Sequence, residues 1–238
     1  MNPYQKLLAR KRKWTPVQTT AGTVQNGAEE TLRRVIALRH MELPVGDFIT
    51  DALSGDIPDL ARELLLSNVK DEENHDLALG FIANAYGVDE KAEKEALALR
   101  DAWTAHPDHT ILKAMVAERA IFSVLLPFLR WNGDAGMRTV SADISRDEQV
   151  HVACNSIVCR ELNLTASPSL DKLRKATINW VMQPLGNNTT SQYLDKKFWL
   201  ESSDRLMYEG KAPQLSQSRS GRMPAFFEHS NVNLPQYA

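Results

Sequence analysis

Two short charged runs in the sequence share a Glu-x-x-His spacing that could bind metal ions. In KDEENHD the pair is Glu72 and His75, and in SRDEQVH it is Glu148 and His151. Side chains three residues apart on a helix lie on the same face one turn apart, so both members of a pair can reach one ion. A single pair of this kind is more typical of a solvated helix face, because charged side chains are mostly exposed.

A further glutamate stands 30 residues before each pair, at Glu42 and at Glu118. Glu118 lies in AMVAERAIFSVLL, on a face that the helical spacing of the apolar residues predicts to be buried. A buried, ionised carboxylate is costly unless a cation or a donor compensates it. The repeated pattern therefore predicts one site for two metal ions. Its expected ligands are Glu42, Glu72, His75, Glu118, Glu148 and His151.

The donor types in this set indicate which metals would suit it. Oxygen and nitrogen donors together, with four negative charges, suit two divalent ions of iron or manganese, whereas zinc prefers fewer, tetrahedral ligands. Ferritin-like di-iron and di-manganese carboxylate bundles present such ligands from facing helices. The choice of acid in KDEENHD stays open, because Asp71, Glu73 and Asp76 crowd that motif.

Helices must position these residues, and apolar residues at helical spacing predict them along most of the chain. The expected helices span 27–53 with a break near Pro44, 56–86 with Asp56 as N-cap and Gly87 after the end, 89–104, 107–131, 136–162, a stretch from TASPSL to 182, and one from NNTTSQ to 208. No segment alternates with period two, so strands are not expected. We predict an all-α, ferritin-like four-helix bundle with additional packed helices.

Composition divides the chain into three parts. Residues 1–25 are polar and basic and are expected to form an N-terminal arm, and residues 26–210 form the helical dimetal domain. Residues 211–238, rich in Ser, Gln, Pro, Arg and Asn, are expected to be a flexible tail that docks on a partner. The basic run 10–13 is expected to face solvent or a partner rather than nucleic acid, since the formal net charge is only −2.

The cysteines and the apolar runs indicate a cytoplasmic protein. Cys154 and Cys159 would diverge by about 140° on a helix, so we expect them to stay unpaired in the core. No run approaches the roughly 18 apolar residues of a membrane span, and the amino terminus lacks the apolar core of a signal peptide. No glycine-rich phosphate loop is present, so no nucleotide site is expected.

The ligand motifs resemble those of one known family. RDEQVH resembles the Arg-Asp-Glu-x-x-His signature of the radical-generating small subunit of class I ribonucleotide reductases, and VAERAIFSV resembles that family's third-ligand helix. The resemblance covers roughly residues 10–160, and the short chain is similar to phage-encoded forms. It implies a homodimeric, ferritin-like subunit of a ribonucleoside-diphosphate reductase, active only with a large subunit. Its metal pair, oxidised by oxygen or a reduced oxygen species, would store an oxidising equivalent that starts the reduction of ribonucleotides to deoxyribonucleotides for DNA replication.

The resemblance also implies a path for radical transfer. Asp147 would hydrogen-bond His75 and Trp14, and Trp14 stands in KWTP where the family often has Trp-x-Pro. A carboxylate that orients a ligating imidazole fixes its tautomer and raises its basicity. Tyr237, in the tail that binds the large subunit, would relay the radical or only anchor the tail.

Two positions depart from the family. The tyrosine that commonly holds the radical is replaced by Leu79, and the first ligand is Glu42 where aspartate is common. Similar relatives without the tyrosine keep the oxidising equivalent on a manganese–iron or di-manganese centre, so these pairs are favoured over di-iron. Two other functions of such a bundle stay open. An oxidase or hydroxylase of a small molecule would need an apolar substrate channel, and an iron store would need a cage assembly.

Overall fold

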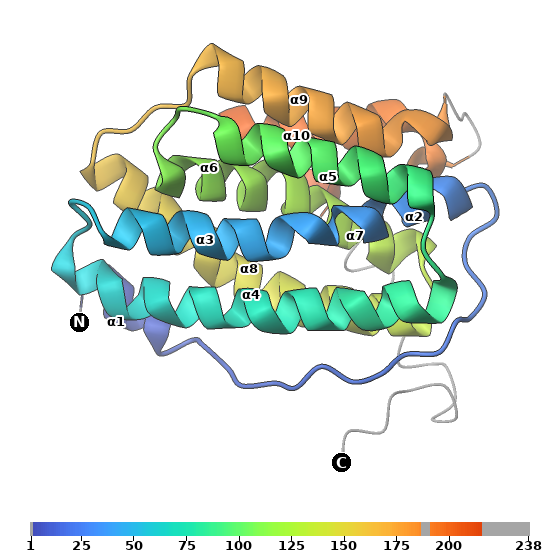
Figure 1. Cartoon of the computed structure of the whole chain (residues 1–238), viewed down its shortest axis with the longest axis horizontal. Helices are drawn as coiled ribbons and strands as arrows, with labels where there is room; N and C mark the ends of the chain where they lie inside the picture. The colour runs from blue at the N-terminus through green and yellow to red at the C-terminus, as the bar shows by residue number, and fades with distance from the viewer. Residues whose placement is uncertain (1, 187–190, 216–238) are drawn as a thin grey trace.

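Four long helical segments carry the predicted ligands. They are α3 (Glu42–Leu53), α4 (Asp59–Tyr86), a rod made of α6 (Thr110–Ala117), η2 (Glu118–Phe122) and α7 (Ser123–Asn132), and α8 (Ala135–Glu161). Helix α3 packs against α4 and α6, and α8 packs against α4 and the rod, so the four segments enclose a common interior (Figure 1). The computed structural model describes residues 2–186 and 191–215, and within these ranges the protein is all-α, without strands.

The inward face of α4 changes character along its length. At both ends it buries apolar side chains at helical spacing, among them Leu64, Leu65, Leu79 and Ile82. In the middle, the same face buries polar residues instead: Asn68, Asp71, Glu72 and His75. Helix α8 repeats this arrangement with Asp147, Glu148, His151 and Asn155. Because buried polar groups need compensation, these two polar stretches mark the centre of the bundle as a site.

The break in the first predicted helix falls earlier than Pro44. The chain forms α2 (Glu29–Ala37), then the 3-10 turn η1 (Leu38–Met41), then α3. Pro44 lies in the first turn of α3, where proline needs no backbone hydrogen-bond partner and its fixed φ suits a helix. The turn therefore sets where α3 begins, with Glu42 as its first residue.

The helix expected over 107–131 contains a π-helical segment at Glu118. This segment, η2, separates α6 from α7, and the Ser123 hydroxyl donates to the Glu118 carbonyl at 2.8 Å. Wider turns of this type are rare and often occur at functional sites. Apolar spacing alone does not reveal such a segment.

Of the remaining helices, α9 (Pro168–Met182) and α10 (Lys196–Glu209) pack against the rod, and α5 (Glu90–Ala105) packs against α2, η1 and α9. Helices α5 and α9 are joined by a hydrogen bond from Trp103 Nε1 to Thr177 Oγ1 at 3.0 Å. Helix α10 begins later than NNTTSQ predicted, with Asp195 as its N-cap. The expected N-cap Asp56 is also wrong: Pro58 holds that position in α4, and Gly87 ends that helix as predicted, at φ 76°.

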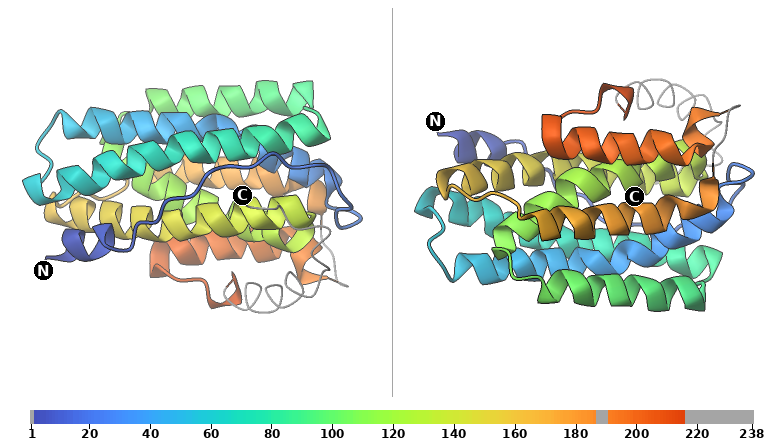
Figure 2. Two further views of the ribbon diagram at one scale, coloured as in Figure 1. Left: turned by 90° about the horizontal axis from the view of Figure 1, so that it is seen from below. Right: turned by 90° about the horizontal axis from the view of Figure 1, so that it is seen from above.

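The N-terminal arm is more closely packed than its polar composition indicated. It begins with α1 (Pro3–Leu8), which buries Tyr4 and Leu7, and continues as an extended segment across the surface between α4 and α8 (Figure 2). The expectation that the basic run faces solvent or a partner is wrong for Lys11 and Arg12. Both side chains form ion pairs with acidic residues of α4 and α8, because those helices leave carboxylates beneath the arm.

Two smaller expectations can be compared with the described residues. Cys154 and Cys159 are both buried and unpaired, as predicted. No helix among the described residues is long and apolar enough to cross a membrane. Most of the predicted tail, including Tyr237, lies outside the described residues.

Candidate metal centre

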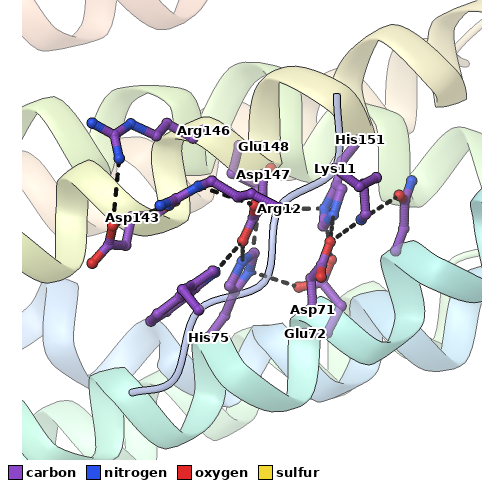
Figure 3. A network of polar contacts seen from close by, with 12 residues as sticks. Lys11, Arg12, Asp71, Glu72, His75, Asp143, Arg146, Asp147, Glu148 and His151 are labelled. Atoms are coloured by element: carbon purple, nitrogen blue, oxygen red, sulfur yellow. Dashed lines mark hydrogen bonds and ion pairs between the residues drawn. The ribbon is translucent and has the colours of Figure 1, made fainter. Parts of the chain in front are cut away.

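The six predicted ligands converge in the interior of the bundle. Their donor atoms form two groups, and within each group all donors lie within 4.8 Å of one another. The first group contains Glu42, Glu72, His75 and Glu148, and the second contains Glu72, Glu118 and His151. Every one of these side chains is at most 3% exposed. Figure 3 shows the pairs from α4 and α8 facing each other. Glu72 belongs to both groups and can therefore bridge two ions.

The polar atoms in this interior lack ordinary partners. Both carboxylate oxygens of Glu42, Glu72 and Glu148, Oε1 of Glu118, and Nδ1 of both histidines make no hydrogen bond to any described residue. Buried carboxylates left in this way are costly. One or two divalent cations would satisfy all of these atoms at once, and carboxylate with imidazole suits iron or manganese. The donor set therefore fits metal ions, without distinguishing between these two.

The Nε2 atom of each histidine, on the side of the ring away from the other ligands, contacts an aspartate. His75 Nε2 lies 3.4 Å from Asp147 Oδ2, and His151 Nε2 lies 2.9 Å from Asp71 Oδ2. Each aspartate comes from the helix opposite its histidine. These contacts place the proton on Nε2 and leave Nδ1 free to bind an ion.

Asp147 lies where the sequence analysis expected it. In addition to its contact with His75, its Oδ2 accepts a hydrogen bond of 2.6 Å from Trp14 Nε1. The Trp14 and His75 rings are stacked, with 6.2 Å between their centroids. Burial would raise the pKa of Asp147, but the hydrogen bonds with His75 and Trp14 hold it below its usual value, so the carboxylate is ionised.

The role of Asp71 was missed, although the sequence contains a signal for it. Both motifs read Asp-Glu-x-x-His, with Asp71 before Glu72 and Asp147 before Glu148. Asp71 was not distinguished from Glu73 and Asp76, the other acids that crowd this motif. Asn155 was also missed: its Nδ2 donates to Glu118 Oε2 at 2.6 Å, from one turn after His151.

The acids of the centre hold their protons more tightly than usual in the absence of a cation. Burial raises the pKa of Glu42 to about 7 and that of Glu118 to about 8, and it raises the pKa of Glu148 well above its ordinary value. Glu72 is the exception: burial would raise its pKa, but its ion pairs with His151 and His75 outweigh burial and lower it.

Both imidazoles of the centre favour the charged form. Burial would lower the pKa of His151, but the hydrogen bond with Asp71 and the ion pair with Glu72 raise it to about 10. His75 is likewise raised well above its ordinary pKa by Asp147 and Glu42, against the effect of burial. Without a cation, the centre therefore holds extra protons on its carboxylates and imidazoles, and a bound cation would displace them.

Metal binding should release protons and should strengthen as the pH rises. At pH 7 Glu118 and His151, with pKa values of about 8 and about 10, carry protons that an incoming ion must displace. Raising the pH removes these competing protons, so the affinity for Mn²⁺ increases. Calorimetric titrations at one pH in two buffers of different ionisation enthalpy will measure the release, with EDTA as the reference chelator. Binding without proton release would contradict this protonated cluster.

No family model, curated protein or solved structure matches this chain.

Proposed function

We propose that this protein is the dimetal small subunit of a class I ribonucleotide reductase, built on a ferritin-like bundle. The observation that supports this most is the connected path from His75 through Asp147 to Trp14. It leads from a metal-facing imidazole to the arm at the surface. Neither an iron store nor a hydroxylase of small molecules needs such a path.

The residues of the chain have distinct tasks in this function. Glu42, Glu72, His75, Glu118, Glu148 and His151 would hold the two ions. When bound, the ion pair supplies a one-electron oxidising equivalent after reaction with oxygen or a reduced oxygen species. Asp147 keeps the proton of His75 on Nε2 and accepts the indole N–H of Trp14. Trp14 would be the side chain that is oxidised, and the Asp147 carboxylate would hold its indole proton in place.

Position 79 favours manganese-containing pairs in this proposal. Leu79 is buried on α4, one turn after His75, and its side chain cannot be oxidised to a lasting radical. The oxidising equivalent would then stay on the ions, as a manganese–iron or di-manganese pair. The partner is a separate large subunit, bound through the tail, with Tyr237 as the relay residue, and the small subunit is a homodimer.

Loading the protein with metal tests the proposal directly. Protein supplied with manganese alone, iron alone, or both should retain two ions per chain by elemental analysis, because two groups of donors are present. After exposure to oxygen or peroxide, electron paramagnetic resonance should show no tyrosyl radical, because Leu79 replaces the tyrosine. Ribonucleotide reduction should then depend on an added class I large subunit. A tyrosyl signal, or protein that retains no metal, would contradict the proposal.

A cavity beside the centre supports a second candidate function. It measures about 820 Å³ and lies between α7, α8 and the residues that follow α10, and Glu148 forms part of its wall. Most of its lining is apolar, including Leu126, Val152, Leu206 and Leu215. Pockets of this size bind small molecules. An oxidase or hydroxylase of a small apolar molecule is therefore the alternative. Unlike radical transfer in the first proposal, its activity would not depend on Trp14.

A further inference from the structure

Two aspartates, Asp71 and Asp147, contact the Nε2 atoms of the histidines. The N-terminal arm contacts each aspartate with a different residue. Lys11 Nζ contacts Asp71 Oδ2 and donates to Asn68 Oδ1 at 3.0 Å. Trp14 instead donates its neutral indole N–H to Asp147. Figure 3 shows Lys11 and Arg12 reaching from the arm toward α4 and α8. Two similar Asp–His pairs thus differ in what holds them from outside.

The contact between Lys11 and Asp71 is a shielded ion pair. The side chains are 10% and 12% exposed, so water weakens their attraction little. Removing one partner of a buried pair leaves an uncompensated charge, which is strongly destabilising for that local arrangement. Lys11 is thus well placed to fix the carboxylate of Asp71 in one orientation.

Arg12 does not provide the same support to Asp147. Its Nε lies 3.9 Å from Asp147 Oδ1, and its Nη2 is bonded to Asp143, at 2.8 Å to the carbonyl and 3.0 Å to the carboxylate. Among the described residues, a basic side chain of the arm therefore makes a direct hydrogen bond to Asp71 and none to Asp147. The outer surroundings of the two histidines are unequal.

We propose that Lys11 is a positioning residue for the metal position at His151. Lys11 fixes Asp71, Asp71 holds Nε2 of His151 at 2.9 Å, and Nδ1 is thereby directed at the ion. The inference rests on the proposed dimetal function. The donor group at His151 contains two carboxylates, Glu72 and Glu118, and the group at His75 contains three, with Glu148 Oε1 at 3.5 Å from His75 Nδ1 and 3.8 Å from His151 Nδ1. We therefore expect the His151 position to bind its ion more weakly and to fill second.

Titration with Mn²⁺ alone, followed by electron paramagnetic resonance, separates the two positions. In the unaltered protein the first equivalent should give the signal of an isolated bound Mn²⁺, and the second should convert it to that of a spin-coupled pair. In Lys11→Met the first step should be unchanged, and the second should weaken by about 10-fold, the lower end of the cost of losing an outer partner of a ligand, because Lys11 acts through Asp71. Lys11→Arg, which can still donate to Asp71, should restore the second step.

Lys13→Met is the matched control, because Lys13 is on the same arm, carries the same charge and is exposed. It should leave both steps unchanged. If Lys11→Met does not fold, as judged by circular dichroism without metal, Lys11→Gln should show the same selective loss. Equal weakening of both steps, or no change in either, would overturn the role of Lys11. If the unaltered protein binds no Mn²⁺ pair, the proposed function itself fails.

Discussion

Replacing Glu72 with alanine should remove both metal ions, whereas replacing Glu42 or Glu118 should remove one. Glu72 is shared by the two groups of donors: its Oε2 lies 3.3 Å from His75 Nδ1, and its Oε1 lies 3.0 Å from His151 Nδ1. Each position loses an anionic donor in Glu72→Ala, so both hold their ion too weakly to keep it through desalting, whereas Glu42→Ala or Glu118→Ala weakens only one position. Elemental analysis after anaerobic loading with Mn²⁺ and desalting should fall from two ions per chain to none.

The neighbouring residue provides the control for this experiment. Glu73 is exposed on the outer face of α4, so Glu73→Ala should keep both ions. The comparison also decides which acid of KDEENHD binds metal, a choice that the sequence left open. Melting temperatures of the metal-free variants, compared with that of the unaltered protein, will separate a loss of metal binding from a loss of folding. Two ions retained by a folded Glu72→Ala protein would exclude Glu72 as the bridge.

The six residues of the buried Glu/His cluster could be identified from the sequence because their signal is local. A Glu-x-x-His pair lies within one helical turn, so it can be recognised in the sequence. The pair occurs twice, each time 30 residues after a further glutamate, Glu42 or Glu118, and such a repeat is improbable by chance. Helix ends marked by glycine, such as Gly87, were predicted for the same reason. The all-α class followed from apolar spacing over whole segments.

The features that were missed depend on contacts between distant segments or on backbone geometry. Lys11 and Asp71 are 60 residues apart, and nothing in the basic run shows that it crosses acids of α4 and α8. The π-helical segment at Glu118 is a change of backbone hydrogen bonding that apolar spacing does not encode. Asp71 could have been found, because both motifs share the dipeptide Asp-Glu.

The relay path and the cavity favour different functions, and one residue distinguishes them. Asp147 is 2% exposed and connects His75 to Trp14, but it does not line the cavity. A hydroxylase acting in that cavity would depend on Glu148 and on the apolar wall. A reductase subunit would depend on Asp147 even when both ions are in place.

Asp147→Asn should therefore lower ribonucleotide reduction by about 10- to 100-fold while both ions are retained at saturating metal. The amide keeps the size of the side chain, and its oxygen can still accept from His75 Nε2 or from Trp14 Nε1. It loses the negative charge, and hydrogen bonds to an ionised acceptor are about twice as strong as neutral ones. The indole proton then has no anionic acceptor when an electron leaves Trp14. The measurement is kcat with a class I large subunit, paired with metal analysis of the same sample.

Asp143→Asn is the matched control, because Asp143 lies one turn before Asp147 on α8 and bonds Arg12 rather than His75 or Trp14. This variant should keep its activity. A folded, fully loaded Asp147→Asn protein that reduces ribonucleotides at the normal rate would show that the contact with Trp14 serves packing alone. Oxidation of a small molecule that survives in Asp147→Asn, with no ribonucleotide reduction in the unaltered protein, would instead assign the centre to the cavity beside Glu148.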